Sequence, residues 1–159
     1  MSLENRVRQA AVTARALGAF VPSVVRSGIL SHRGGIGQAA ALGRYWFTTA
    51  REVEQGHLAT PHRLALIDDD GELTYRQLRE NSRTLARHLI GLGLDEIRLG
   101  VMARNGRGII YPLAAKGYAG AGIFLLNVGS SAEQLTGCLV ENDINVLVID
   151  DEFLERLDP

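Results

Sequence analysis

The sequence predicts an α/β fold in which a partial parallel sheet of βαβ units follows a β-hairpin and an N-terminal helical extension. Two patterns support this prediction. Three apolar runs, residues 97–103, 122–126 and 145–149, are separated by helix-length segments, as is typical of parallel strands joined by crossover helices. Before them, the runs 64–68 and 72–75 flank a turn rich in Asp and Gly, which predicts an antiparallel hairpin.

Residues 1–55 are predicted to form a helical, Arg-rich extension. Residues 3–21 have apolar side chains at helical spacing up to Pro22, and the loop 31–35 precedes a second helical stretch that ends near Gly56. We interpret both as helices that pack on the following domain, residues 56–159. A membrane-surface contact through residues 3–53 is the alternative, because arginines border the apolar stripe. The stripe of the second stretch consists of Ala39, Leu42, Trp46, Ala50 and Val53.

Capping residues set the expected bounds of the helices in the domain. Two of these helices begin at predicted capping boxes, in which a hydroxyl residue pairs with Gln or Glu three residues later. A pair of glycines ends the first of the two, and a third helix lies between them. The first capping box is Thr74 with Gln77, and Gly91 and Gly93 end the helix that it begins. The helix between runs from about Gly108 to Tyr118, and Ser130 with Glu133 is the second capping box.

Charge is divided unevenly along the 159 residues, whose net charge is −1. Residues 1–51 hold seven arginines and one acid, whereas the rest holds ten basic and seventeen acidic residues. A net charge near zero does not favour a nucleic-acid partner. The single cysteine, Cys138, excludes an internal disulfide and fits the cytoplasm, and we expect its thiol to be buried. The four histidines show no ligand spacing, so no metal site is expected.

Residues 99–127 place a strand, a Gly-rich turn and a helix where nucleotide-binding folds hold phosphates. A dinucleotide fingerprint needs a third glycine where Tyr111 stands, and we expect the Tyr111 ring to hold the helix away from the strand. Asn127 replaces the acid that would bind a ribose, and Lys116 is not followed by the Ser or Thr of a phosphate loop. We therefore interpret these glycines as turn and cap residues.

Four other clusters are interpreted as structural. The carboxylates of residues 68–70 and 150–152 are expected to be solvated where strands end. Ser130 and Ser131 lack the frame of a nucleophile, so a helix cap is favoured. The aromatic residues 45–47 are expected in the core, since no dense basic strand surface accompanies them. No catalytic, cofactor-binding or metal-binding residue is predicted.

The order of these elements and their amino-acid sequences resemble the N-terminal part of the adenylate-forming (AMP-binding) superfamily, and within it bacterial fatty-acid–CoA ligases. The resemblance covers residues 56–153, about two-thirds of the chain. Two positions depart from the family pattern: Glu96-Ile97 replaces a usual Gly-Asp, and Val128 replaces a usual Thr. The matching segments are 61–68 (PHRLALID), 73–78 (LTYRQL), the helix ending GLGL, 100–105 (GVMARN), 113–127 (LAAKGYAGAGIFLLN) and 135–150.

The resemblance implies that a complete enzyme would use ATP and Mg²⁺ to form an acyl-adenylate, and would then transfer the acyl group to CoA. The family's Ser/Thr/Gly-rich phosphate loop, magnesium-binding Glu and C-terminal lysine are not among these 159 residues. We therefore expect an N-terminal fragment that binds no cofactor and is inactive alone. Its expected partners are the missing C-terminal part or a second copy of the chain. The alternatives are one half of a split ligase, and a non-catalytic partner or membrane-surface module peripheral to the membrane.

Overall fold

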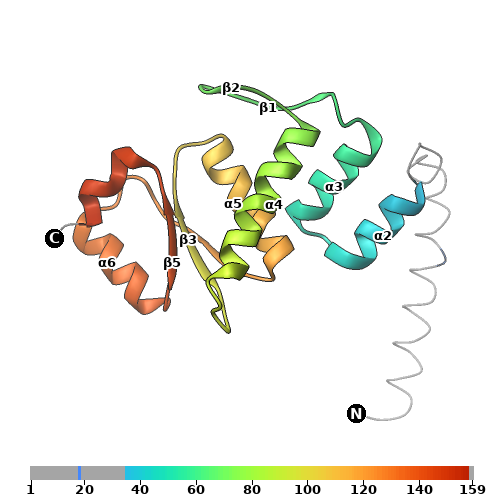
Figure 1. Cartoon of the computed structure of the whole chain (residues 1–159). Coiled ribbons are helices and arrows are strands. Elements are labelled where there is room, and N and C mark those ends of the chain that lie inside the picture. Colours follow the sequence, from blue (N-terminus) through green and yellow to red (C-terminus); the bar gives the residue numbers. More distant parts are fainter. Residues whose placement is uncertain (1–17, 19–34, 158–159) are drawn as a thin grey trace, which may run out of the picture.

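The structure, a computed structural model, describes residues 18 and 35–157 (Figure 1). The helix expected over residues 3–21 therefore lies outside the described residues, apart from residue 18. The elements in chain order are α2 (Gly35–Tyr45), α3 (Thr49–Ala59), β1 (Leu64–Asp68), β2 (Gly71–Thr74), α4 (Tyr75–Gly91), β3 (Arg98–Met102), α5 (Arg107–Ala119), β4 (Gly122–Leu125), α6 (Ala132–Glu141), β5 (Val146–Ile149) and the 3₁₀ helix η1 (Asp151–Leu157).

The predicted α/β architecture is confirmed. Strands β1 and β2 pair antiparallel as a hairpin, and β3, β4 and β5 form a parallel sheet in the order β4-β3-β5. The chain therefore leaves β3 toward one neighbour and later returns to pair on the opposite side. Figure 1 shows α4 and α5 on one side of this sheet and α6 on the other.

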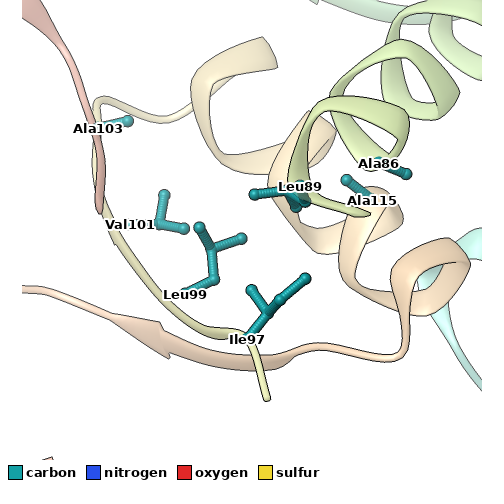
Figure 2. Close-up of a cluster of buried hydrophobic side chains, with 7 residues drawn as sticks. All are labelled: Ala86, Leu89, Ile97, Leu99, Val101, Ala103 and Ala115. Atoms are coloured by element: carbon teal, nitrogen blue, oxygen red, sulfur yellow. The ribbon is translucent and has the colours of Figure 1, made fainter. Parts of the chain in front are cut away.

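Strand β3 is buried on both of its faces, as expected for the central strand of a covered parallel sheet. Leu99 and Val101 point toward α4 and α5, where Figure 2 shows them in one cluster. Met102 points to the other face and packs with Leu135 of α6 and Phe153 of η1. Full burial of each such side chain contributes about 1.5–3 kcal/mol. The labelled cluster of Figure 2 comprises Ala86, Leu89, Ile97, Leu99, Val101, Ala103 and Ala115.

The two predicted capping boxes meet different outcomes. The first is confirmed: the Thr74 side chain accepts the N–H of Gln77, whose side chain accepts the N–H of Thr74. The second is wrong by one residue, because Ser131 pairs with Gln134. Ser130 instead closes the preceding turn, donating its N–H to the carbonyl of Asn127.

The stretch predicted as one helix ending near Gly56 is two helices, α2 and α3. The break falls at Trp46, which has a φ of 46°, in the left-handed region that a bulky residue seldom adopts. The interpretation of residues 45–47 as core is also wrong for two of the three. Trp46 and Phe47 are 71% and 74% exposed, whereas Tyr45 packs edge-on against Tyr118.

Helix α3 packs closely on α4 and α5. Ala50 and Val53 are buried, and a Cβ added to Gly117 of α5 would lie 2.7 Å from the Ala50 Cβ. Glu54, also buried, accepts from the Nε of Arg79 at 2.9 Å. Residue 55, the predicted end of the N-terminal extension, lies inside α3. The division into an extension of residues 1–55 and a domain of residues 56–159 remains a prediction. No helix among the described residues is both long and apolar enough to cross a bilayer.

Candidate functional site

An open cleft of about 320 Å³ lies at the carboxyl end of the parallel sheet. Strands β3 and β5 are neighbours there, but β3 continues into α5 on one face and β5 into η1, which packs with α6 on the other. Open α/β sheets bind ligands at such a switch point. The lining residues are Asp68, Asp69, Asp70, Arg104, Asn105, Arg107, Gly108, Asp150, Asp151 and Glu152.

The Asp68 carboxylate fixes the hairpin to the beginning of α5. The Nε and Nη2 atoms of Arg107 donate to it at 2.9 Å and 2.6 Å, and the backbone N–H of Arg107 donates to the same carboxylate at 2.9 Å. A carboxylate at a helix N-terminus is further stabilised by the helix dipole. The hydrogen bonds from Arg107 lower the pKa of Asp68 to about 2.

A second set of polar contacts joins the end of β5 to the end of β3. The Asp150 carboxylate accepts the backbone N–H of Arg104 at 2.7 Å. The Nη2 of Arg104 donates to Glu152 at 2.6 Å, and its Nε donates to the other oxygen of the same carboxylate. These hydrogen bonds from Arg104 lower the pKa of Glu152.

Two glycines make room for these carboxylates. Gly106 has a φ of 134°, and a Cβ there would lie 3.0 Å from an Asp68 oxygen. A Cβ on Gly108 would lie 2.9 Å from the Ala103 Cβ and 3.1 Å from an Asp150 oxygen. The interpretation as turn and cap glycines is confirmed for Gly106, which precedes α5, and for Gly120, which ends α5 with a φ of 73°. It is wrong for Gly108 and Gly117, which lie inside α5 and pack against neighbouring elements.

Two expectations about this region are wrong. Asp68 and Asp150 are not solvated strand ends, because both accept backbone N–H groups of the turn after β3. Tyr111 does not separate α5 from the sheet: its ring packs beside Leu78 of α4, and its hydroxyl accepts from Asn81. Gly108 allows α5 to approach β3 closely. In the dinucleotide-binding fingerprint the third glycine, three residues later, has this role. The sequence identified each acid as polar, but nothing local indicated a partner about forty residues away.

The residues of the cleft do not fit a nucleoside triphosphate. Six carboxylates line it against two arginines, and both arginines are already paired with carboxylates. The two backbone N–H groups described above, at positions 104 and 107, are likewise taken by the chain's own acids. A polyphosphate would meet net negative charge. No group of three or more His, Cys, Asp or Glu in the described part of the chain is placed to hold a metal ion.

The remaining singled-out residues do not gather into a catalytic site. Cys138, expected to be buried, is half-buried, with its sulfur 3.6 Å from the amide nitrogen of Asn142. Burial lowers the pKa of His57, with the charge of Arg79 adding to that effect. A buried polar cluster had no counterpart among the residues predicted from the sequence: Glu54 accepts from Arg79 and from the hydroxyl of Tyr118. Burial, followed by the charge of Glu54, raises the pKa of Tyr118.

Comparison with known proteins identifies the family of the chain. Residues 53–159 match the AMP-binding enzyme family. The chain belongs to that family. Its segments correspond to the N-terminal portion of the adenylate-forming superfamily, as the resemblance predicted. Enzymes of this family use ATP, Mg²⁺ and CoA.

Two curated relatives and one solved structure illustrate the match. The chain is 32% identical over 107 residues to the nonribosomal peptide synthetase EcdA of Aspergillus rugulosus, covering 66% of this chain and 2% of the synthetase. It is 30% identical over 102 residues to the 2-succinylbenzoate–CoA ligase of Bacillus cereus, covering 64% of this chain and 21% of the ligase. The structure of a benzoate CoA ligase from Burkholderia xenovorans superposes with a TM-score of 0.65 at 20% identity, covering 70% of this chain and 23% of that one.

This chain therefore spans about a fifth or less of the length of these curated relatives. The matched part contains the hairpin, the parallel sheet and α4 to α6, and it begins within α3. The cleft at the carboxyl end of the sheet lies inside the matched part. Its two arginines, with Asp68, Asp150 and Glu152, join the hairpin, α5 and η1 to one another.

Proposed function

We propose that this chain is the N-terminal scaffold of a fatty-acid–CoA ligase. The complete enzyme would join a fatty-acid carboxylate to the α-phosphate of ATP with release of pyrophosphate, and would pass the acyl group to the thiol of CoA with release of AMP. The family match over residues 53–159 carries the proposal. Because the cleft of this chain does not fit a triphosphate, the part described here supplies framework, and the rest of the enzyme supplies the ATP site.

The proposal of a fatty-acid substrate rests on the resemblance of the sequence to bacterial fatty-acid–CoA ligases. Residues 100–105 and 113–127 are among the segments that resemble bacterial fatty-acid–CoA ligases. The first segment forms most of β3 and the turn after it, and the second forms most of α5 and β4. The relatives also include proteins named for 2-succinylbenzoate and benzoate, so the competing substrate class is an aromatic carboxylic acid.

Pyrophosphate release tests the activity and the substrate. The purified chain is incubated with ATP, Mg²⁺ and, in turn, a long-chain fatty acid, benzoate and 2-succinylbenzoate. The same assay is repeated after adding the polypeptide encoded directly downstream. We expect no release from the chain alone, and release with the fatty acid once the downstream polypeptide is present.

Release by the 159 residues alone would overturn the scaffold role. Release with an aromatic acid but not with the fatty acid would overturn the substrate. Downstream DNA that encodes no phosphate loop and no lysine domain would remove the proposed partner and leave the membrane-surface module as the competing function.

A second function, contact with a membrane surface, is favoured by the turn between α2 and α3. Trp46 and Phe47 are mostly exposed there, and arginines lie on either side: Arg44 precedes them and Arg51 stacks 4.8 Å from the Phe47 ring centroid. Aromatic side chains beside arginines suit the headgroup region of an anionic bilayer. The left-handed φ of Trp46 costs roughly 1–3 kcal/mol, a strain that often marks a functional position.

Co-sedimentation with anionic liposomes tests this second function. The double variant Trp46→Ser/Phe47→Ser should lose most of the bound fraction. Ile67→Ser is the control, because Ile67 is 67% exposed but lies on the hairpin. Equal binding by the double variant and the wild-type chain would exclude this turn from a membrane contact.

A further inference from the structure

Three arginines line a second cavity, separate from the cleft at the sheet. This cavity has a volume of about 200 Å³ and lies where α2, α4 and α5 meet. Its lining contains no acidic residue among the described positions. The residues are Arg44, Tyr45, Arg83, Ala86, Arg87, Ile90 and Tyr118.

The floor of the cavity orients two of the guanidinium groups. Tyr45 and Tyr118 meet edge to face with their ring centroids 5.2 Å apart. The Arg44 guanidinium lies 5.6 Å from the Tyr45 centroid, and that of Arg83 lies 5.7 Å from the Tyr118 centroid. A guanidinium packed on a ring keeps its N–H donors directed outward in its own plane, which suits bidentate binding of a phosphate.

The positive charge of this cavity is largely unneutralised. Neither Arg44 nor Arg87 forms an ion pair with any residue that the structure describes. Arg83 is 3.5 Å from Glu54, but that carboxylate is already held by Arg79, whose Nε is 2.9 Å from both of its oxygens. The only acid that pairs with any of the three arginines among the described residues is therefore Glu54, which Arg83 shares with Arg79.

The position of two of these arginines is unfavourable unless an anion is present. Arg83 and Arg87 are four residues apart on α4 and so lie on the same face of the helix. Like charges at this spacing destabilise a helix. Arg87 is held in place by a 2.8 Å hydrogen bond from its Nη2 to the Thr84 hydroxyl, which leaves its other donors available.

We propose that the cavity between Arg44, Arg83 and Arg87 is a binding site for a phosphate group. The volume accommodates one phosphate with part of the group that carries it, and the three guanidinium groups supply charge-assisted hydrogen bonds. The phosphate belongs either to a soluble molecule or to a phospholipid headgroup. The exposed Ile90 on the rim offers an apolar contact to either. This site is independent of the ligase activity proposed above.

Titration with inorganic phosphate at constant ionic strength tests the site. Binding is measured by calorimetry, and amide chemical shifts locate it on the wild-type chain. We expect shifts at Tyr45, Ala86 and Tyr118, and a weakening of about tenfold for each arginine removed. The test variant is Arg44→Gln/Arg87→Gln, which changes two exposed side chains and leaves the Glu54 cluster intact. The control is Arg63→Gln/Arg76→Gln, which removes the same charge from exposed positions outside the cavity.

A parallel arm identifies the source of the phosphate. Phosphatidylcholine vesicles with and without phosphatidic acid are compared for sedimentation of the same three proteins. Loss of phosphatidic-acid-dependent binding in the test variant alone assigns the site to a lipid headgroup. Loss of inorganic phosphate binding without any vesicle binding assigns it to a soluble phosphate. No binding in either arm, equal binding by the test variant, or chemical shifts confined to other positions overturns the proposal.

Discussion

Asp68 shows how one side chain can connect parts of the fold that are distant in sequence. It ends β1, and its carboxylate accepts three donors from Arg107, thirty-nine residues later. Its side chain is 8% exposed, whereas that of the neighbouring Asp70 is 73% exposed. The three consecutive aspartates are equivalent by composition alone, and only the packed turn after β3 distinguishes them.

Replacing Asp68 should reduce the acid sensitivity of the fold. Hydrogen bonds from Arg107 lower the pKa of Asp68 from 3.8 to about 2. As the pH falls through this range, the unfolded chain takes up a proton that the folded chain refuses, so stability is full above about pH 4 and is lost toward about pH 2. The melting temperature of Asp68→Asn, followed by circular dichroism, should therefore be lower than wild type at neutral pH and should fall less steeply between those values.

Asp69→Asn is the matched control for this experiment. It removes the same charge from an exposed neighbour that makes no ion pair among the described residues. The control should retain the wild-type acid dependence. If Asp68→Asn followed the same curve as wild type, the pair with Arg107 would not be formed in solution.

At the scale of elements, small residues allow the helices to approach one another closely. Helix α5 carries Gly117 against Ala50 of α3, and Gly108 against Ala103 at the end of β3. The sequence predicted α4, α5 and all five strands to within a few residues, because period and capping are local properties. It did not predict the break between α2 and α3. The apolar stripe continues through Trp46 with helical spacing, so the periodic pattern gives no sign of the left-handed φ at which the helix breaks.

Alanine at Gly117 should destabilise the chain, although alanine normally favours a helix. The added Cβ would lie 2.7 Å from the Ala50 Cβ, and neither atom can rotate away, so α3 must shift. Overpacking of this kind costs about 1–3 kcal/mol. In the control Gly137→Ala, on α6, the Cβ meets no atom within 4 Å, and alanine should stabilise by about 0.5–1 kcal/mol. Urea denaturation measures both changes; equal stabilisation by the two substitutions would contradict the close contact of α3 with α5.

At the scale of the whole molecule, the sequence indicated the class of fold and its family, whereas the two cavities come from tertiary structure. Hydrophobic period and turn residues repeat locally, so the parallel sheet and the hairpin could be predicted. The cavity of the three arginines brings together α2, α4 and α5, and no sequence pattern joins Arg44 to Arg83 and Arg87. The paired acids and arginines of the cleft at the sheet were likewise visible only as separate charged residues.

The unpaired edges of the parallel sheet predict that the chain self-associates in solution. With the order β4-β3-β5, both outer strands have one edge unpaired within the described residues, and Leu125 on β4 is 57% exposed. Unpaired apolar edges promote association with another chain. Sedimentation velocity should show the average mass rising with concentration, and Leu125→Lys should shift the chain toward monomer. The control is Leu92→Lys, because Leu92 is 54% exposed but lies just beyond α4. Monomer at every concentration, or an equal effect of the control, would show that the edge of β4 does not mediate self-association.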